Sequence, residues 1–147
     1  MKEDITGTLV LDASVLIDLL MSSSRGKVIQ KALLDEIIDA HTTEFAIIET
    51  KYILCRKIGW NEATRRVEKL LVSGYISVSK TSDIIDLAAE YKCNRRISLA
   101  DSLVLALAKK FNCKALFSHR EKELIEEMNK NDFDVTILFL EDYITQP

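Results

Sequence analysis

Three acidic residues each lie in a strongly apolar part of the sequence. Asp12 directly follows the apolar run Leu9–Leu11, Glu49 lies among aromatic and aliphatic residues, and Asp101 lies near the start of a stretch rich in leucine and alanine. A charged carboxylate near a protein core is costly unless something compensates it. Carboxylate oxygens are the ligands that Mg²⁺ and Mn²⁺ prefer, and a divalent cation would relieve the repulsion among three clustered acids. The set therefore predicts an Mg²⁺ or Mn²⁺ site.

Each acid taken alone also has an ordinary structural interpretation. Asp12 is equally suited to cap the helix that follows it. Glu49 can reach solvent from the edge of its helix or pair with a basic residue. Ser98-x-x-Asp101 resembles a capping box, and a helix start favours an acid. What favours the metal site is that the three acids come from distant segments and each lies at an element end or on an apolar face.

Two further acids follow another apolar segment. Glu121 and Glu123 come shortly after Ala115–Phe117, and one of them is a candidate for the same cleft. Mixed Glu and Lys residues near a helix start are also usual on solvated surfaces, so the second interpretation stays open.

Several common chemistries lack their motifs. The sequence contains neither Gly-x-Gly-x-x-Gly nor Gly-x-x-x-x-Gly-Lys, so the usual dinucleotide and P-loop phosphate sites are missing. His41 and His119 are the two histidines, and the three cysteines are scattered, which excludes a zinc site of ordinary composition. A Gly-x-Ser-x-Gly nucleophile motif is absent as well. Carboxylate chemistry remains.

Composition narrows the class of protein. A net charge of −3 argues against a general basic coat for nucleic acids but leaves room for a local basic rim. No apolar run approaches the ~20 residues of a membrane helix, so we expect no membrane association. Three cysteines, Cys55, Cys93 and Cys113, suit reduced and mostly buried thiols. We therefore expect a soluble cytoplasmic protein with a single domain, residues 1–147.

The elements that must position the acids alternate between short strands and helices. We predict strands at 9–11, 40–42, 75–78, 115–117 and 135–140, and helices starting near 13 and covering 27–39, 43–57, 61–72, 81–92, 98–111 and 121–130. Such alternation is typical of an α/β fold, with a short central parallel sheet flanked by helices on both faces. Sites in these sheets form beyond the carboxyl ends of the strands, where Asp12 and the segment after Phe117 lie.

The ordered set of motifs resembles the PIN-domain family, and VapC-like toxins in particular. The motifs are a strand ending in Asp12 with Ser14 two residues later, Glu49 in a helix, and Ser98-Leu-Ala-Asp101 opening a Leu/Ala-rich helix. The resemblance covers nearly the whole chain and implies a three-layer PIN-like fold. It implies that Asp12, Glu49 and Asp101 are catalytic, metal-site acids, with Ser14 supporting them and Ser98 ordering the helix that carries Asp101.

A fourth acid of the family pattern does not align cleanly. Arg120 stands where an Asp is expected, so Glu121, one residue later, is the better candidate, and Glu123 comes after it. This departure leaves the second metal position open.

The resemblance also implies a function. It predicts an Mg²⁺- or Mn²⁺-dependent endoribonuclease that cleaves RNA phosphodiester bonds, forms a homodimer and pairs with a small antitoxin protein. Arg95 and Arg96 lead into the Asp101 helix and are candidates for contact with RNA phosphates, although a solvated connection explains them as well. His119 is a candidate for proton transfer, or an ordinary surface histidine.

Two rival functions remain. A catalytically silent PIN-like binding or scaffold module would keep the acids for its fold or for weak metal binding, and the irregular fourth acid favours it. A phosphatase with an aspartate nucleophile would also place Asp12 after a strand, but the second Asp two residues later is missing, since Ser14 stands there.

Overall fold

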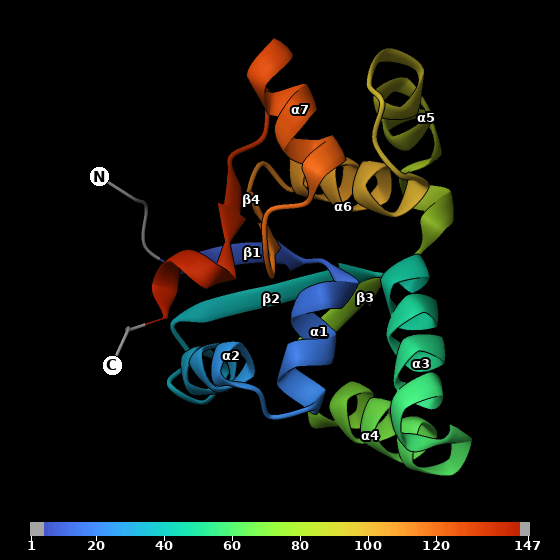
Figure 1. The fold of residues 1–147 in the computed structure, drawn as a ribbon, viewed down its shortest axis with the longest axis vertical. Helices are drawn as coiled ribbons and strands as arrows, with labels where there is room; N and C mark the ends of the chain where they lie inside the picture. Colours follow the sequence, from blue (N-terminus) through green and yellow to red (C-terminus); the bar gives the residue numbers. More distant parts are fainter. Residues whose placement is uncertain (1–4, 145–147) are drawn as a thin grey trace.

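The computed structural model describes residues 5–144, and in this range five strands form one parallel sheet (Figure 1). The order across the sheet is β3-β2-β1-β4-β5, so β1 lies at the centre. The strands are β1 (Gly7–Leu11), β2 (Ile38–Thr43), β3 (Ile76–Ser79), β4 (Lys114–Phe117) and β5 (Ile137–Phe139). All carboxyl ends therefore lie at the same edge, as the sequence analysis predicts.

Seven α-helices connect or follow these strands within the described range. They are α1 (Ala13–Leu20), α2 (Ser24–Leu34), α3 (Glu44–Ile58), α4 (Trp60–Ser73), α5 (Ile85–Asn94), α6 (Leu99–Lys110) and α7 (Lys122–Lys130). Short 3₁₀ helices cover Thr81–Asp83 and Leu140–Tyr143. The predicted α/β fold with a flanked parallel sheet is confirmed.

Alternating side chains of β1 serve two separate cores. Leu9 and Leu11 pack with α1 and α2 on one face of the sheet, whereas Val10 packs with α5, α6 and α7 on the other. Successive side chains of a strand point to opposite faces, so a central strand buried on both sides must be apolar throughout. The sheet is thus the middle layer of three (Figure 1).

Helix α3 stands beside the edge of the sheet where β1 and β2 end (Figure 1). It packs mainly against α4 and α1, and Leu54 of α3 forms a small core with Ala63 and Val67 of α4. At its start, the Thr43 hydroxyl accepts a hydrogen bond from the Ala46 N–H at 2.9 Å. This packing brings α3 next to the strand ends.

The predicted helix over 27–39 is wrong in its second half, because α2 ends at Leu34 and Ile38 begins β2. Glu36 adopts a left-handed φ of 57°, the Glu36 N–H bonds the Leu33 carbonyl, and the Ile37 N–H bonds the Ala32 carbonyl. These bonds form a Schellman-type helix end, a place where glycine is the usual signal. Glutamate at this position hid the end of the helix.

Other differences are small. The predicted helix over 81–92 begins with a 3₁₀ turn, so α5 itself starts at Ile85, and the last strand is shorter than 135–140. Cys93 is exposed, and Cys55 and Cys113 are only half-buried, which corrects the expectation of mostly buried thiols. No helix within residues 5–144 has the length and apolarity to span a membrane. The predicted single domain extends into residues 1–4 and 145–147, which lie outside the described range.

Candidate active site

Asp12 occupies the junction between the central strand and α1. Its backbone N–H donates to the Leu116 carbonyl at 2.9 Å, which continues the pairing of β1 with β4. One carboxylate oxygen, Oδ2, accepts the Ser14 N–H at 3.0 Å and the Ser14 hydroxyl at 2.7 Å. Asp12 is therefore the N-cap of α1, and it is also buried, with 5% of its surface exposed. The capping role and a role at the site are compatible.

Ser14 links this corner to the end of the neighbouring strand. Its hydroxyl oxygen accepts the backbone N–H of Ser118 at 3.0 Å while its proton goes to Asp12. Ser118 is the first residue after β4 and is buried. The carboxyl ends of β1 and β4 are thus joined through one side chain.

A pocket of about 410 Å³ opens at this edge of the sheet. Asp12, Glu49 and Glu121 contribute acids to its wall from β1–α1, α3 and the β4–α7 loop. Its lining is completed by Ala13, Ser14, Ile17, Asp18, Arg25, Ile53, Ser118 and His119. Segments far apart in the sequence therefore present carboxylates to one space.

Asp101 lies in the first turn of α6 and is 4% exposed. The Ser98 hydroxyl caps this helix by accepting the Asp101 N–H at 3.0 Å. Asp101 does not line the pocket itself, yet it is close enough to Asp12, Glu121 and Glu49 for their charges to affect its ionisation. Asp101 and Asp12 are the two most buried of the four acids Asp12, Glu49, Asp101 and Glu121.

The electrostatics of the four acids reflect their burial and their proximity. Burial, followed by the charges of Asp12 and Glu121, raises the pKa of Asp101 to about 8. The same causes in the same order raise the pKa of Glu49 to about 7. Burial also raises the pKa of Asp12, against the hydrogen bonds from Ser14, and the pKa of Glu121, with the charge of Asp12 adding to it. Four carboxylates that disfavour one another's ionisation form a site that attracts a cation.

The loop after β4 separates the two candidates for the fourth acid. Glu121 is half-buried, lines the pocket and precedes α7 as its N-cap residue, whereas Glu123 is exposed. Arg120 does not line the pocket. Its guanidinium donates to both Asp142 oxygens at 2.8 Å and lies 4.7 Å from the centre of the Phe139 ring. The geometry places Glu121, rather than Glu123, beside Asp12 and Glu49.

The donor set suits a hard divalent cation, although its side chains are spread. Within residues 5–144, no three acidic, histidine or cysteine side chains are already drawn together tightly enough to hold one ion. None of the four acids forms an ion pair with a lysine or arginine in that range, so the protein supplies them with no basic partner. Carboxylate oxygens without such a partner fit Mg²⁺ or Mn²⁺, and metal ligation by these residues stays a prediction.

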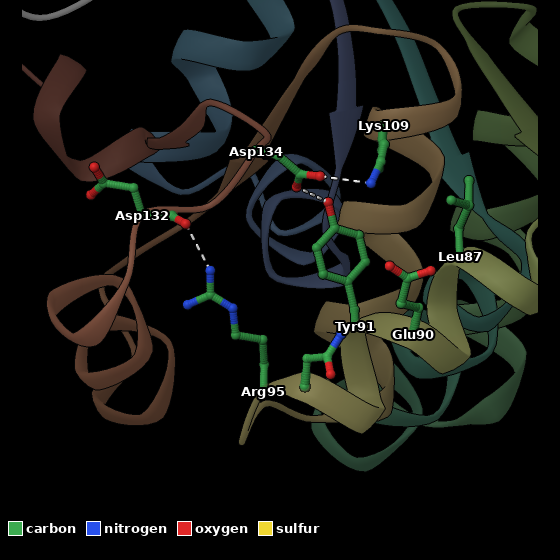
Figure 2. Close-up of a pocket in the computed structure, with 8 residues that line it drawn as sticks. Leu87, Glu90, Tyr91, Arg95, Lys109, Asp132 and Asp134 are labelled. Carbon is green, nitrogen blue, oxygen red and sulfur yellow. Dashed lines mark hydrogen bonds and ion pairs between the residues drawn. The ribbon is translucent and has the colours of Figure 1, made fainter.

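Arg95 is held by the protein itself, away from the acids. Its guanidinium donates to the carbonyls of Glu127, Asn131 and Asp132 at 3.1, 2.8 and 2.7 Å, and it lies 3.9 Å from the centre of the Phe133 ring. Figure 2 shows it in a pocket shared with Tyr91, Lys109 and Asp134, where none of the four acids is found. Arg95 thus binds carbonyl groups at and just after the end of α7. Arg96 is exposed. RNA contact by either residue stays a prediction.

Sequence reasoning missed two residues of the pocket wall. Asp18 lies four residues after Ser14, one helical turn along the same face of α1, and this spacing is the signal that identifies it. Arg25, from α2, has no comparable signal, because its place depends on how the α1–α2 corner is built. The Ser118 hydroxyl donates to Asp18 Oδ2 and accepts a hydrogen bond from Arg25 Nη1 at 3.2 Å.

The comparison with protein families agrees with this arrangement. The sequence profile of the PIN domain matches residues 9–129, which is most of the chain and includes all four acids. The chain belongs to the PIN domain family. No curated protein matches this PIN domain protein at a significant level.

Solved structures share the PIN fold at low sequence identity. VapC20 of Mycobacterium tuberculosis, described as a toxin that cleaves the sarcin-ricin loop, has a TM-score of 0.63 and 17% identity, covering 80% of this chain and 93% of that one. VapBC-1 of nontypeable Haemophilus influenzae has a TM-score of 0.60 and 15% identity, covering 91% of this chain and 98% of that one. A toxin–antitoxin complex from Klebsiella pneumoniae has a TM-score of 0.58 and 17% identity, covering 79% of this chain and 89% of that one.

Proposed function

We propose that this PIN domain protein is a divalent-metal-dependent endoribonuclease and the toxin of a toxin–antitoxin pair. The observation that carries the proposal is the acidic pocket at the carboxyl ends of β1 and β4, where Asp12, Glu49 and Glu121 share one space and influence Asp101. The solved structures with this fold support it, since one is described as a toxin that cleaves the sarcin-ricin loop and another as a toxin–antitoxin complex.

Asp12, Glu49 and Asp101 are the residues that would hold Mg²⁺ or Mn²⁺, with Glu121 available for a second ion. Bound there, such an ion would supply Lewis-acid chemistry, making a water molecule a better nucleophile for an RNA phosphodiester and stabilising negative charge. This chemistry needs no covalent protein intermediate.

The remaining residues of the site orient the acids. Two donors from Ser14 hold the Asp12 carboxylate in one orientation, and the Ser98 cap fixes the first turn of α6 that carries Asp101. His119 is exposed at the pocket, where its charge offsets part of the rise in the pKa values of Asp12 and Glu121. Its position at the rim makes it the candidate for proton transfer in this proposal.

Asp12→Asn and Asp101→Asn test the proposal with RNA as substrate. Each change keeps the size of the side chain but removes a negative oxygen ligand. Since loss of a supporting contact alone costs about 10–100-fold at metal sites, we expect at least about 100-fold slower cleavage of ribosomal RNA in Mn²⁺. Gel analysis of cleavage over time measures the rate.

Asp86→Asn is the matched control, because Asp86 is an exposed acid in the first turn of α5, outside the pocket. It should cleave at the wild-type rate. Wild-type activity in Asp12→Asn and Asp101→Asn would reject the assignment of the site, and so would unchanged activity in excess EDTA.

Partners belong to the same proposal. We propose a homodimer that acts in the cytoplasm and is inhibited by a small antitoxin. The antitoxin is supported by the Klebsiella structure, which is described as a toxin–antitoxin complex. Leu34 at the end of α2 and Leu71 and Val72 at the end of α4 are exposed apolar side chains that such a dimer would bury. Light scattering after gel filtration should give twice the mass of one chain, and the mass of a single chain would contradict the dimer.

A catalytically silent PIN module is the second candidate. The spread of the acid side chains and the displacement of the fourth acid to Glu121 favour it. Such a module would bind little Mn²⁺ and leave RNA intact, so the same experiments separate it from the nuclease.

A further inference from the structure

The acidic pocket has one permanently cationic side chain in its wall. Among the described residues that line it, Arg25 and His119 are the ones with basic side chains, and only Arg25 keeps its charge at every physiological pH. Arg25 belongs to the first turn of α2 and is half-buried. Its position differs from that of a surface arginine on a solvated helix.

A network of hydrogen bonds fixes the Arg25 guanidinium. Its Nη1 donates to the Ser118 hydroxyl at 3.2 Å, and that hydroxyl donates in turn to Asp18 Oδ2. The other Asp18 oxygen accepts the Ser23 hydroxyl at 3.0 Å. Ser118 also donates its backbone N–H to Ser14, which holds Asp12. The arginine and the metal-site acid are therefore joined through two serines.

The corner between α1 and α2 sets the distance of Arg25 from this network. Gly26, the next residue, packs so closely on α1 that a Cβ atom there would lie 1.9 Å from the Asp18 carbonyl oxygen. Ser23 begins α2 by accepting the Gly26 N–H at 3.0 Å. The backbone on both sides of Arg25 is thus anchored to α1, so the guanidinium is held in place before any ligand arrives.

The guanidinium has hydrogen-bonding capacity left. Arginine carries five N–H donors in a planar fork that matches two oxygens of a phosphate. Within residues 5–144, the Ser118 hydroxyl is the one acceptor that Arg25 contacts. We propose that Arg25 binds a phosphate of the RNA backbone at the wall of the acidic pocket; this rests on the proposed nuclease function.

A phosphate contact by Arg25 would offset the repulsion between this acidic protein and RNA. A chain with a net charge of −3 and four acids at its site repels a polyanion beyond the reach of a bound ion. Arg95 donates to three carbonyl groups and lines a different pocket, so it is not placed to contact a phosphate in the acidic one. A phosphate contact by Arg25 would position the backbone without reading its sequence.

Arg25→Ala and Arg25→Lys test the proposal by fluorescence anisotropy. The probe is a fluorescein-labelled single-stranded RNA of mixed sequence, in Ca²⁺, an oxygen-binding ion that replaces Mn²⁺. We expect Arg25→Ala to bind about 10-fold more weakly, as the loss of one charged hydrogen-bonded contact predicts. The slope of log affinity against log KCl concentration should fall by about 0.7 for one lost phosphate contact. Arg25→Lys should keep the slope but bind less tightly than the wild type, because an ammonium group lacks the fork.

Lys31→Ala is the matched control, since Lys31 lies on the same helix but is exposed and pairs with Asp35 at 3.0 Å. Its affinity and salt slope should equal those of the wild type. Mn²⁺ affinity measured by calorimetry should be the same in Arg25→Ala and the wild type. This result would show that the variant still has an intact acidic pocket. Equal affinity and slope in Arg25→Ala and Lys31→Ala, with a wild type that binds and cleaves RNA, would overturn this inference alone. A wild type that neither binds nor cleaves RNA would overturn the proposed function as well.

Discussion

At the scale of single residues, the site depends on carboxylates that are hard to ionise. Asp12 and Asp101 are almost completely buried, and each of the four acids raises the pKa of at least one other or is itself raised by one. An ion that binds there must displace protons, so its apparent affinity depends on pH. Burial thus disfavours the charged form of these carboxylates as long as no cation is bound.

The metal-free protein should lose stability as the pH rises. The pKa of Asp101 rises on folding from 3.8 to about 8, and that of Glu49 from 4.5 to about 7, chiefly through burial. The folded chain therefore binds more protons than the unfolded chain across this window, and the free energy of unfolding falls between about pH 4.5 and about pH 8. Urea unfolding in EDTA measures it. Asp101→Asn should have a shallower slope, and a stability that stays level or rises over the window in the wild type would contradict the account.

Ser14 should matter to the metal more than to the fold. Ser14→Ala removes the hydroxyl that orients Asp12 and accepts the Ser118 N–H, and supporting contacts of this kind are worth about 10–100-fold in metal affinity. We expect Mn²⁺ to bind about 10-fold more weakly, measured by calorimetry. Ser24→Ala, at an exposed position in the first turn of α2, is the control. Equal affinities in the two variants would remove Ser14 from the site.

At the scale of elements, the ends of β1 and β4 and the starts of α1 and α6 bring the acids together. The Ser98 and Thr43 caps fix where α6 and α3 begin, and the α1–α2 corner adds Arg25 and Asp18 to the same wall. Small changes at such junctions move whole side chains, because helices and strands transmit a displacement over their length.

Gly26→Ala tests the corner between α1 and α2. A methyl group 1.9 Å from the Asp18 carbonyl forces the two helices apart, and overpacking of this kind costs about 1–3 kcal/mol or more. At about 2–4 °C per kcal/mol for a chain of this size, the melting temperature should fall by several degrees. Lys27→Ala, at the next and exposed position of α2, should melt close to the wild type. If Gly26→Ala and Lys27→Ala have the same melting temperature, the close approach of Gly26 to the Asp18 carbonyl does not exist in solution.

Sequence reasoning reached the elements that carry periodic patterns or clear signals at their ends. Ser98 indicated the start of its helix, and Asp12 was visible as a charge after an apolar strand. The end of α2 was hidden because Glu36, not glycine, takes the left-handed position. Arg25 was hidden for a different reason: its role depends on tertiary packing at Gly26, which has no periodic signature.

At the scale of the whole molecule, a parallel sheet covered on both faces leaves one edge where polar groups from distant segments meet. The order β3-β2-β1-β4-β5 places β1 at the centre, so Asp12 lies between α3 on one side and the loop after β4 on the other. The PIN domain match extends over the same segments. The fold thus explains why acids far apart in the sequence meet at one edge of the sheet.

The most direct test of the central claim is calorimetric titration of the metal-free protein with Mn²⁺ at a pH above the raised pKa values, in the wild type and in Asp101→Asn. We expect saturable binding by the wild type and its loss, or a decrease of about 100-fold, in the variant, with Asp86→Asn binding like the wild type. A wild type that binds no Mn²⁺, or an Asp101→Asn variant that binds it equally well, would contradict a metal site built from these acids.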